Sequence, residues 1–465
     1  MVRLEYLAFE HNNAAAELVR QAYDTPPLAF VHSYGCQQNV NDGERIKGVL
    51  VDIGYGLCEK PEDADLILFN TCAVREHAEQ RVFGNVGALK GLKEKKPGLI
   101  IGLCGCMANQ KHVVEKLRQS YPYVDLVFGV DGIDTLPQLV AQKLQKHKRV
   151  LLEPAQRPVI VENIPIRRES EFRAWLPIMY GCDNFCTYCI VPYVRGREKS
   201  RKPGDILAEF KGLVEAGYKE ITLLGQNVNS YGKDLGTDYD FADLLAAINA
   251  IPGDYWLRFM SSQPKDATNK LFDTMARCEH VAKQLHLPVQ SGCDRVLKAM
   301  NRPYTRAKYE EMIAYARSVM PGMVLTSDVI IGFPGETEDE AMQTVDLVEK
   351  TQFDALFTFI FSPRPGTPAA KMDDPVSREE KQVWFEKLVD AQNAISAKKH
   401  AAYIGRTVKV LVDGESDDEA FPLAARTEGN RLVRMKGDKA LIGTFAKAKI
   451  TDSNTWALYG EAVEE

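Results

Sequence analysis

The sequence lacks the features that would place it in a membrane. No stretch approaches the roughly 18 consecutive apolar residues that a membrane-spanning helix needs, and the first twenty residues carry acids where a signal peptide would have an unbroken apolar segment. Internal repeats and low-complexity tracts are absent as well. These absences predict a globular cytoplasmic protein without a membrane partner.

The sequence also lacks an overall positive charge, since its formal net charge is -6. Such a sum argues only weakly against a nucleic-acid partner, because a local basic face is enough to contact phosphates. Residues 195–202 hold five basic side chains against one acidic, and residues 426–449 hold seven against two. For residues 195–202, an ordinary solvent-exposed surface explains the basic side chains equally well.

The 465 residues exceed the size at which one hydrophobic core keeps growing, so two or three domains are expected. A leader is assigned to residues 1–25. Over residues 26–150, strand-like runs alternate with helices predicted to begin at Asp42, Ala73 and Ala108. This alternation predicts a parallel α/β sheet. Residues 151–170 show little periodicity and are assigned to a linker.

Six more strand-like runs lie within residues 171–400, with helical sequence between them and a long helix predicted from Ser377 to His400. They predict an α/β fold of the partial (β/α)6 TIM-like type, with its site at the carboxyl ends of the strands. After Tyr403 the pattern changes to short β-like runs broken by glycine. Residues 401–465 are therefore predicted to form a small β-barrel.

The densest cysteine motif is CDNFCTYC, in which Cys182, Cys186 and Cys189 follow the first strand of this barrel. Three thiolates on one short loop can hold three irons of a 4Fe-4S cluster and leave the fourth iron open. An open iron can chelate S-adenosylmethionine, whose reductive cleavage yields a 5'-deoxyadenosyl radical. A zinc site would want a fourth ligand close by, and none is visible. These cysteines are therefore predicted to be catalytic metal ligands.

A second set of cysteines is dispersed along the chain but shares one kind of position. Cys36, Cys72 and Cys106 each lie at the end of a predicted strand, just before a helix. In a parallel sheet these positions meet at one edge, so the three are predicted to hold a second cluster. Cys104 competes with Cys106 as a ligand, and Cys106 is favoured because it reaches past the sheet edge. Three isolated cysteines are expected to be structural, although the last lies near the barrel mouth: Cys58, Cys278 and Cys293.

Polar side chains at the strand ends of the barrel are candidates for contact with the cofactor. Tyr188, inside the cysteine loop, is expected to hydrogen-bond the adenine through its backbone, and Arg302 is expected to pair with a carboxylate; the alternatives are a packed ring and a surface cation. In GFPGET, Thr337 is expected to cap a helix. The other candidates follow or lie on barrel strands: Gln226, Asn227, Ser261, Ser262, Gln290 and Asp328.

These motifs resemble the methylthiotransferase family of radical S-adenosylmethionine enzymes over residues 28–463, and within it the MiaB-type branch that acts on tRNA. GCQQNVNDGE, NTCAVRE and GCMA resemble the family's amino-terminal cluster domain, and YGCDNFCTYCIVPYVRGREKSR resembles its radical motif. LPVQSGCDRVLKAMNRPYT, SDVIIGFPGET and FSPRPGTPAA resemble its barrel. The last 65 residues resemble a TRAM RNA-binding domain. The sequence departs from the family pattern in two places. It has GCQQN where close relatives usually have GCQMN, and its leader has no counterpart.

The resemblance implies a reaction on N6-isopentenyl(dimethylallyl)adenosine at position 37 of tRNA, giving the 2-methylthio derivative. It implies two 4Fe-4S clusters, with sulfur carried on the cluster of the dispersed cysteines and S-adenosylmethionine as both methyl donor and radical source. Relatives act on threonylcarbamoyladenosine or on a ribosomal-protein aspartate, so both remain alternatives. From another class, a non-catalytic, zinc-stabilised RNA-binding protein also remains an alternative.

The expected partner is the anticodon stem-loop of tRNA, because specific RNA recognition usually targets single-stranded loops. Three arginines of the basic carboxyl-terminal segment, Arg426, Arg431 and Arg434, are expected to contact tRNA phosphates rather than bases. An electron donor such as flavodoxin or ferredoxin and a sulfur source are expected as further partners. The chain is expected to be a monomer.

Overall fold

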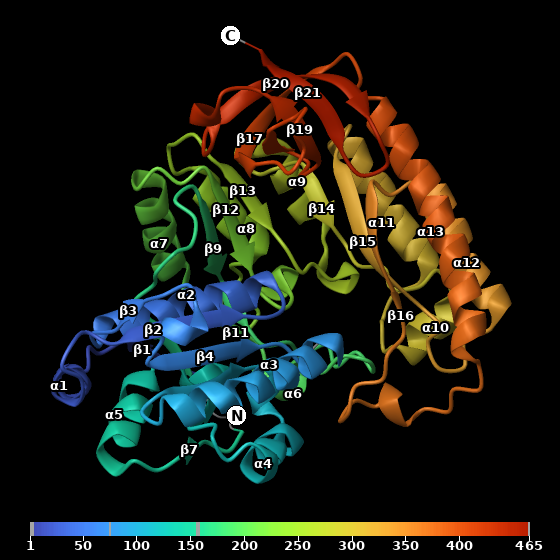
Figure 1. Cartoon of the computed structure of the whole chain (residues 1–465). Helices are drawn as coiled ribbons and strands as arrows, with labels where there is room; N and C mark the ends of the chain where they lie inside the picture. The colour runs from blue at the N-terminus through green and yellow to red at the C-terminus, as the bar shows by residue number, and fades with distance from the viewer. Residues whose placement is uncertain (1–3, 74–75, 155–158, 464–465) are drawn as a thin grey trace. The chain divides into compact units, whose positions relative to one another are not determined.

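The computed structural model describes residues 4–73, 76–154 and 159–463. The chain divides into two compact units, which Figure 1 colours along the sequence. The amino-terminal unit holds residues 1–169, 179–185 and 189–201, and the carboxyl-terminal unit holds the rest. The cysteine loop is therefore divided, since Cys182 and Cys189 belong to the first unit and Cys186 to the second.

A six-stranded parallel sheet forms the core of the amino-terminal unit, in the order β3-β2-β4-β5-β6-β7. The central strands β4 and β5 are buried at every position, which is typical of parallel strands covered on both faces. The prediction of a parallel α/β sheet is confirmed. The strands are β2 (Leu28–Ser33), β3 (Gly56–Leu57), β4 (Leu66–Thr71), β5 (Ile100–Gly105), β6 (Leu126–Phe128) and β7 (Val150–Leu151).

Helices α2 (Gln37–Asp52), α3 (Glu76–Lys95), α4 (Lys111–Ser120) and α5 (Leu136–Lys146) follow strands of this sheet. Helix α2 begins before the predicted start at Asp42, because Cys36 has extended backbone and acts as its N-cap. Helix α4 begins after Ala108, because a 3-10 turn intervenes. The helix predicted from Ala73 corresponds to α3. Residues 74 and 75, next to its predicted start, lie outside the described residues.

The leader and the linker both contain regular structure that the sequence did not predict. Strand β1 (Glu5–Ala8) pairs in parallel with strand β8 (Val159–Glu162). Helix α1 (Asn13–Ala22) buries Ala15 and Val19 in the core that covers the sheet. The partners of this pairing are far apart in the chain, so no local pattern reveals it. Linker residues 155–158 lie outside the described residues, and the domain boundaries stay predictions.

Six parallel strands of the carboxyl-terminal unit form two three-stranded sheets, in the orders β13-β12-β9 and β14-β15-β16. A parallel bridge from Leu257 of β13 to Val281 extends the first sheet toward the segment that leads into β14. The prediction of a partial barrel of six β/α units is confirmed. The strands are β9 (Arg173–Pro177), β12 (Glu220–Leu224), β13 (Trp256–Phe259), β14 (Gln284–His286), β15 (Val324–Ile331) and β16 (Ala355–Ile360).

Helices connect these strands and cover their outer faces, as Figure 1 shows for α12 and α13. The predicted cap is present, since Thr337 and Glu340 form a capping box at the start of α12. The helices are α7 (Pro203–Glu215), α8 (Phe241–Asn249), α9 (Asn269–Arg277), α10 (Asp294–Ala299), α11 (Arg306–Val319), α12 (Glu338–Thr351) and α13 (Arg378–Ala401).

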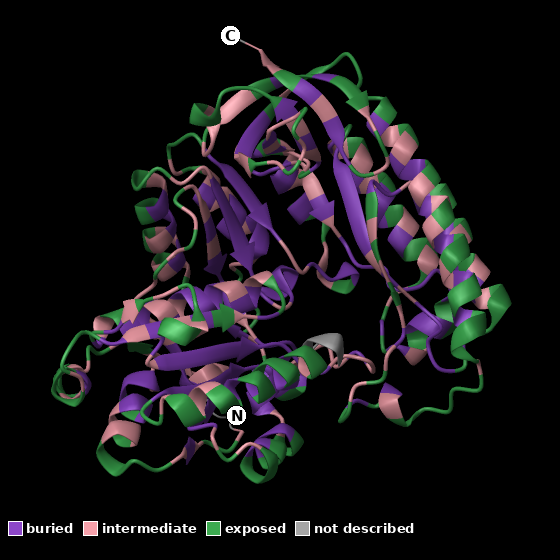
Figure 2. Ribbon diagram, in the orientation of Figure 1, coloured by how far each residue is buried: buried purple, intermediate pink, exposed green. Residues whose placement is uncertain are grey.

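The chain ends in a closed five-stranded barrel, in the order β17-β18-β19-β21-β20. Closure leaves no open sheet edge, and the inward-facing positions form an apolar core that is purple in Figure 2. The predicted small β-barrel is confirmed. Its strands are β17 (Thr407–Glu415), β18 (Leu423–Thr427), β19 (Leu432–Lys436), β20 (Phe445–Ser453) and β21 (Leu458–Val463).

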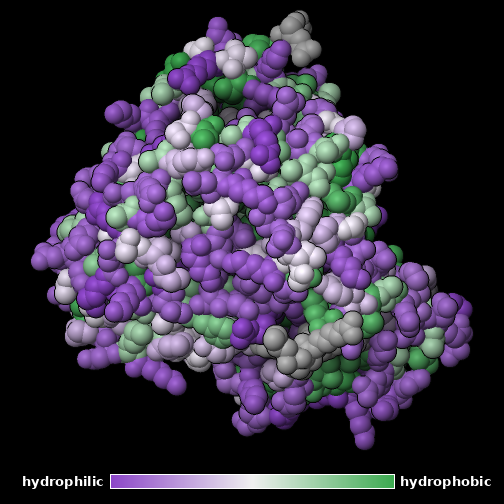
Figure 3. Space-filling view, turned by 180° about the vertical axis from the view of Figure 1, so that it is seen from behind, coloured by the Kyte–Doolittle hydropathy of each residue, from purple (hydrophilic) through white to green (hydrophobic). Residues whose placement is uncertain are grey.

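Short elements complete the described chain. Strands β10 (Met179–Tyr180) and β11 (Lys199–Ser200) pair antiparallel, and helix α6 (Val191–Arg195) lies between them in sequence. None of the described helices combines the length and apolar character needed to cross a membrane, and the face drawn in Figure 3 is mainly hydrophilic. The 3-10 turns are Pro61–Asp63, Met107–Asn109, Val130–Gly132, Val228–Ser230, Pro264–Asp266, Ala369–Lys371 and Lys439–Leu441.

Candidate functional site

The three dispersed cysteines occupy one edge of the amino-terminal sheet. Cys36 follows β2, Cys72 follows β4 and Cys106 follows β5, and β4 lies between the other two strands. All three strands are parallel, so their carboxyl ends meet at this edge. Cys72 and Cys106 are buried, whereas Cys36 is exposed.

Close backbone packing brings the loop of Cys36 against Cys72. Gly35 has φ +114°, and a Cβ atom there would lie 2.5 Å from the Cβ of Cys72. Only glycine fits this position, because any side chain would push the two cysteine-bearing segments apart. The β2–α2 turn is therefore built to let these segments approach each other.

The thiol of Cys106 is strongly influenced by its surroundings. Burial raises its pKa to about 12; the Arg195 guanidinium opposes this rise, and negative charge at Cys72, Asp42 and Cys36 adds to it. A free thiol here keeps its proton at neutral pH, and binding to iron would release that proton. Without a metal, such a buried thiol is a poor nucleophile.

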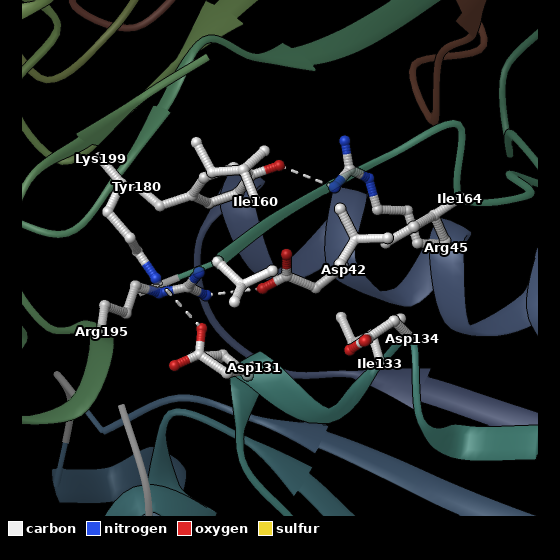
Figure 4. Close-up of a pocket in the computed structure, with 13 residues that line it drawn as sticks. Asp42, Arg45, Asp131, Ile133, Asp134, Ile160, Ile164, Tyr180, Arg195 and Lys199 are labelled. Atoms are coloured by element: carbon white, nitrogen blue, oxygen red, sulfur yellow. Dashed lines mark hydrogen bonds and ion pairs between the residues drawn. The ribbon is translucent and has the colours of Figure 1, made fainter. Parts of the chain in front are cut away.

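Arg195, at the end of α6, joins the cysteine edge to helix α2. Its Nε donates a hydrogen bond to Cys106 Sγ at 3.0 Å, and its Nη2 donates one to Asp42 Oδ2 at 2.7 Å. The guanidinium is 5% exposed, and Figure 4 shows it pointing at Asp42. Cys104 lies within β5 and is fully buried. The contact with Arg195 therefore favours Cys106 over Cys104 as a ligand.

The dispersed cysteines offer three thiols for a candidate cluster. A four-iron cluster takes each thiolate on a different iron, so its ligands are spread more widely than those of one ion. Three strand-end cysteines, two of them buried and one held by a cation, are consistent with such a ligand set.

The first cysteine of the radical motif is held by its own segment. Cys182 N donates to Gly196 O at 3.1 Å, and Asn184 Nδ2 donates to Cys182 Sγ at 3.3 Å. Asp183 pairs with Arg197 at 2.6 Å. A Cβ at Gly181, where φ is +77°, would lie 2.0 Å from a backbone oxygen. These contacts fix the start of the loop against residues 196–197.

The middle of the motif is anchored in the carboxyl-terminal unit. Thr187 N donates to Met300 O at 3.1 Å, and Thr187 O accepts from Ala369 N at 2.9 Å. The ring of Tyr188 packs against a buried apolar cluster that contains Cys293. This placement agrees with the packed-ring alternative for Tyr188 and with a structural role for Cys293.

Arg302 is buried, so the surface-cation alternative does not apply. It is 7% exposed; Nη1 lies 3.5 Å from Cys186 Sγ, Nη2 donates to Pro288 O at 2.7 Å, and Nε donates to Tyr304 Oη at 2.8 Å. These contacts use three of the five N–H groups of the guanidinium, so the pairing with a cofactor carboxylate stays a prediction. The contact of Nη1 with Cys186 also lets Arg302 orient that thiol.

The strand ends of the barrel present strained backbone and buried polar groups. Val228 N donates to Ser261 O at 3.1 Å, which joins the loops after β12 and β13. Ser261 and Gln290 have φ of 68° and 70°, in the left-handed region that is strained for non-glycine residues. Gln226 is half-buried in the first of these loops, and Asp328 on β15 lies 3.6 Å from His286.

Four buried side chains in these two loops carry polar atoms without a hydrogen-bond partner among the described residues: Asn227 Oδ1, both amide atoms of Asn229, Ser262 Oγ and Gln263 Oε1. Such groups are costly unless a ligand or water satisfies them. They fit the many polar groups of S-adenosylmethionine. Asn229 and Gln263 are absent from the sequence prediction, although the polar runs NVNS and SSQP after two strands signalled them.

The three predicted RNA-binding arginines differ in accessibility. Arg426 pairs with Asp413 at 3.2 Å, and Arg434 pairs with Asp417 at 3.0 Å. Arg431 is 7% exposed and forms an ion pair with Asp354, in the turn before β16. This burial and pairing favour a structural role for Arg431, and its contact with a tRNA phosphate stays a prediction.

Three protein families match successive parts of the chain. Residues 29–129 match the family described as Uncharacterized protein family UPF0004, residues 176–348 match the Radical SAM superfamily, and residues 401–463 match the TRAM domain. A Thermoanaerobacter sp. (strain X514) protein named tRNA-2-methylthio-N(6)-dimethylallyladenosine synthase is 50% identical over 93% of this chain and 92% of its own length. The chain belongs to this methylthiotransferase family. A Desulforamulus reducens member with the same name is 47% identical over 95% of this chain and 97% of its own.

Solved structures similar to this family member share its fold. The radical S-adenosylmethionine methyltransferase TsrM from Kitasatospora setae aligns over 74% of this chain and 75% of its own, with a TM-score of 0.54 and 15% identity. The cobalamin-dependent radical enzyme OxsB aligns over 79% of this chain and 56% of its own, with a TM-score of 0.51 and 14% identity. The radical S-adenosylmethionine fold and enzyme class predicted from the sequence are confirmed.

Proposed function

We propose that this chain methylthiolates C2 of N6-dimethylallyladenosine at position 37 of tRNA, giving 2-methylthio-N6-dimethylallyladenosine. The observation that carries the proposal is identity of about half the residues, over nearly the whole chain, with relatives named for this reaction. The radical motif, the dispersed cysteines and the carboxyl-terminal barrel all lie inside the matched length.

The radical S-adenosylmethionine domain implies S-adenosylmethionine and one 4Fe-4S cluster, and we assign Cys182, Cys186 and Cys189 to that cluster. The bound pair supplies the radical that removes hydrogen from an aromatic carbon, where no acid–base route exists. Arg302 and Asn184 orient two of the three thiols. Asn227, Asn229 and Ser262 offer buried polar atoms for the cofactor.

A second 4Fe-4S cluster on Cys36, Cys72 and Cys106 belongs to the proposal. It is supported by their shared sheet edge, by the burial of two of them and by the Arg195 contact with Cys106. An open iron at this place would hold the sulfur that enters the product. A sulfur source is therefore required in addition to the methyl donor.

The choice of an isopentenyl substrate is supported by the more exposed face of β16. Phe357 and Phe359 alternate with half-buried residues on this strand and are 53% and 42% exposed. Phe357 is opposite Asp328, and Phe359 is opposite Ile330, which packs near Tyr188 of the radical motif. An apolar prenyl group suits these rings, whereas the carboxylate of threonylcarbamoyladenosine would meet the negative Asp328.

The proposed macromolecular partner is the anticodon stem-loop, with Arg426 and Arg434 contacting phosphates. The TRAM match and the relatives' tRNA name support RNA binding. An electron donor such as flavodoxin or ferredoxin, a monomeric state and a cytoplasmic location complete the proposal.

The deciding experiment is anaerobic reconstitution followed by iron and sulfide analysis of the wild type and of a variant with Cys182, Cys186 and Cys189 changed to Ala. About eight irons should fall to about four. Isopentenylated tRNA, incubated with the wild type, S-adenosylmethionine, sulfide and dithionite, should then yield the methylthio nucleoside by mass spectrometry. If the wild type instead holds about four irons and the variant holds none, the second cluster is removed from the proposal.

The same samples distinguish the zinc-stabilised RNA-binding alternative from the proposed enzyme. Thiolate-bound iron absorbs near about 400 nm, whereas zinc thiolates are colourless in the visible. A colourless protein with bound zinc and no methylthio product would contradict the proposed enzyme.

A further inference from the structure

Arg195 is a buried cation with two specific contacts. Its segment follows the radical motif directly, yet its Nε reaches the sulfur of Cys106. Its Nη2 reaches Asp42 on helix α2, a contact that Figure 4 shows. Burying a guanidinium is costly unless a negative partner lies close. Asp42 supplies one such partner, and the sulfur of Cys106 occupies the position of a second.

The contact with Cys106 is selective. A neutral thiol is a weak hydrogen-bond acceptor, whereas a thiolate bound to iron is a charged one. Two other cations line the adjacent cavity and contact oxygen atoms: Arg45 donates to Tyr180 Oη at 2.7 Å, and Lys199 lies 3.5 Å from Asp131. Arg195 is the cation whose hydrogen bond to Cys106 the structure describes.

Asp42 is held on both sides. Its Oδ2 accepts from Arg195, and its Oδ1 accepts from Gln38 Nε2 at 3.1 Å. Arg195 and Asp42 are 5% and 4% exposed and border a cavity of about 70 Å³, so little water reaches the pair itself to screen it. Among the described residues, Cys106 therefore has a cation in direct contact and a carboxylate behind that cation.

We propose that Arg195 is a positioning residue that makes the cluster on Cys36, Cys72 and Cys106 easier to reduce, and that Asp42 limits this effect. This rests on the proposed second cluster. Reduction adds one electron, and a donor hydrogen bond with positive charge at a ligand sulfur stabilises the reduced form. The segment that carries the last radical cysteine thus also sets the redox balance of the sulfur-carrying cluster.

The test uses the full chain with Cys182, Cys186 and Cys189 changed to Ala, so that only the second cluster remains. Its reduction is followed by electron paramagnetic resonance during a potentiometric titration. Arg195→Gln should lower the ratio of reduced to oxidised cluster about tenfold at a fixed potential, which corresponds to ~59 mV for one electron. Asp42→Asn should raise the ratio, because it removes the opposing charge.

The matched control is Arg197→Gln, which removes an exposed arginine from the same segment, one that pairs with Asp183. In this variant the ratio of reduced to oxidised cluster should equal that of the parent. If Arg195→Gln fails to hold iron, Arg195→Lys keeps the charge while losing the fixed donor, and it should show a smaller fall than tenfold.

The outcomes separate the two proposals. A parent variant without iron would overturn the second cluster itself. Four irons with unchanged ratios in the Arg195 and Asp42 variants, or with shifts in the same direction, would overturn the role of Arg195 while leaving the cluster intact.

Discussion

Glu336 is a carboxyl group that the described fold buries almost completely. It is 1% exposed; Oε2 accepts from Phe333 N at 3.1 Å, and Oε1 has no hydrogen-bond partner among the described residues. Burial raises its pKa to about 7, although two backbone donors oppose the rise. At the residue scale, the GFPGET turn therefore contains a titratable group that the capping role of Thr337 does not explain.

The sign of its effect on stability follows from proton counts. The folded chain keeps the Glu336 proton up to about pH 7, while the unfolded chain releases it near pH 4.5. Between these values the folded state binds more protons, so stability falls as pH rises. Glu336→Gln should remove this slope, worth about 2–3 kcal/mol between pH 5 and pH 8, as measured by denaturant midpoints.

Glu340→Gln is the control with the opposite shift. A hydrogen bond from Arg295 lowers the pKa of Glu340 to about 2, so its stabilising effect is complete above about pH 4.5 and is lost only as pH falls toward 2. This variant should lose stability equally at pH 5 and pH 8. An unchanged slope in Glu336→Gln would show that the carboxyl is not the titrating group.

At the element scale, local patterns predicted strands and helices well, and long-range pairing poorly. The strand-end positions of Cys36, Cys72 and Cys106 were predictable, because alternation fixes the strands and a parallel sheet has one carboxyl edge. The pairing of β1 with β8 was not, because neither short segment contains a signal for a distant partner. The Arg195 contact with Cys106 was missed for the same reason, since it depends on tertiary packing.

Strand β16 carries the prediction about substrate choice. Changing Phe357 and Phe359 to Ala should reduce kcat/KM for isopentenylated tRNA by about tenfold or more, since losing a few apolar contacts costs 1–3 kcal/mol. The ratio of kcat/KM for isopentenylated tRNA to kcat/KM for unprenylated tRNA should fall by the same factor. Thr358→Val, on the other face of the strand, should leave that preference intact. A preserved preference in the double variant would place the prenyl group elsewhere.

At the scale of the whole molecule, buried pairs join the carboxyl-terminal barrel to the (β/α)6 barrel within one unit. Arg258 of β13 donates to Thr427 O at 3.0 Å, the rings of Trp256 and Phe445 lie 4.7 Å apart, and Arg431 pairs with Asp354. The TRAM region is therefore more than a separate RNA-binding attachment, and basic residues in it divide between structure and RNA contact.

Arg431 and Arg434 are close in sequence and should respond in opposite ways. Arg431→Met breaks a buried pair and should lower stability by about 2–3 kcal/mol, less than the usual 3–5 because Lys399 also contacts Asp354 at 3.0 Å. Arg434→Met loses a pair with exposed Asp417 and a longer one with Asp418 at 3.6 Å, both open to solvent, so its stability should change by less than about 1 kcal/mol. Its tRNA affinity should fall and depend less steeply on salt. If Arg431→Met were fully stable but deficient in tRNA binding, Arg431 would have to leave Asp354 to meet a phosphate.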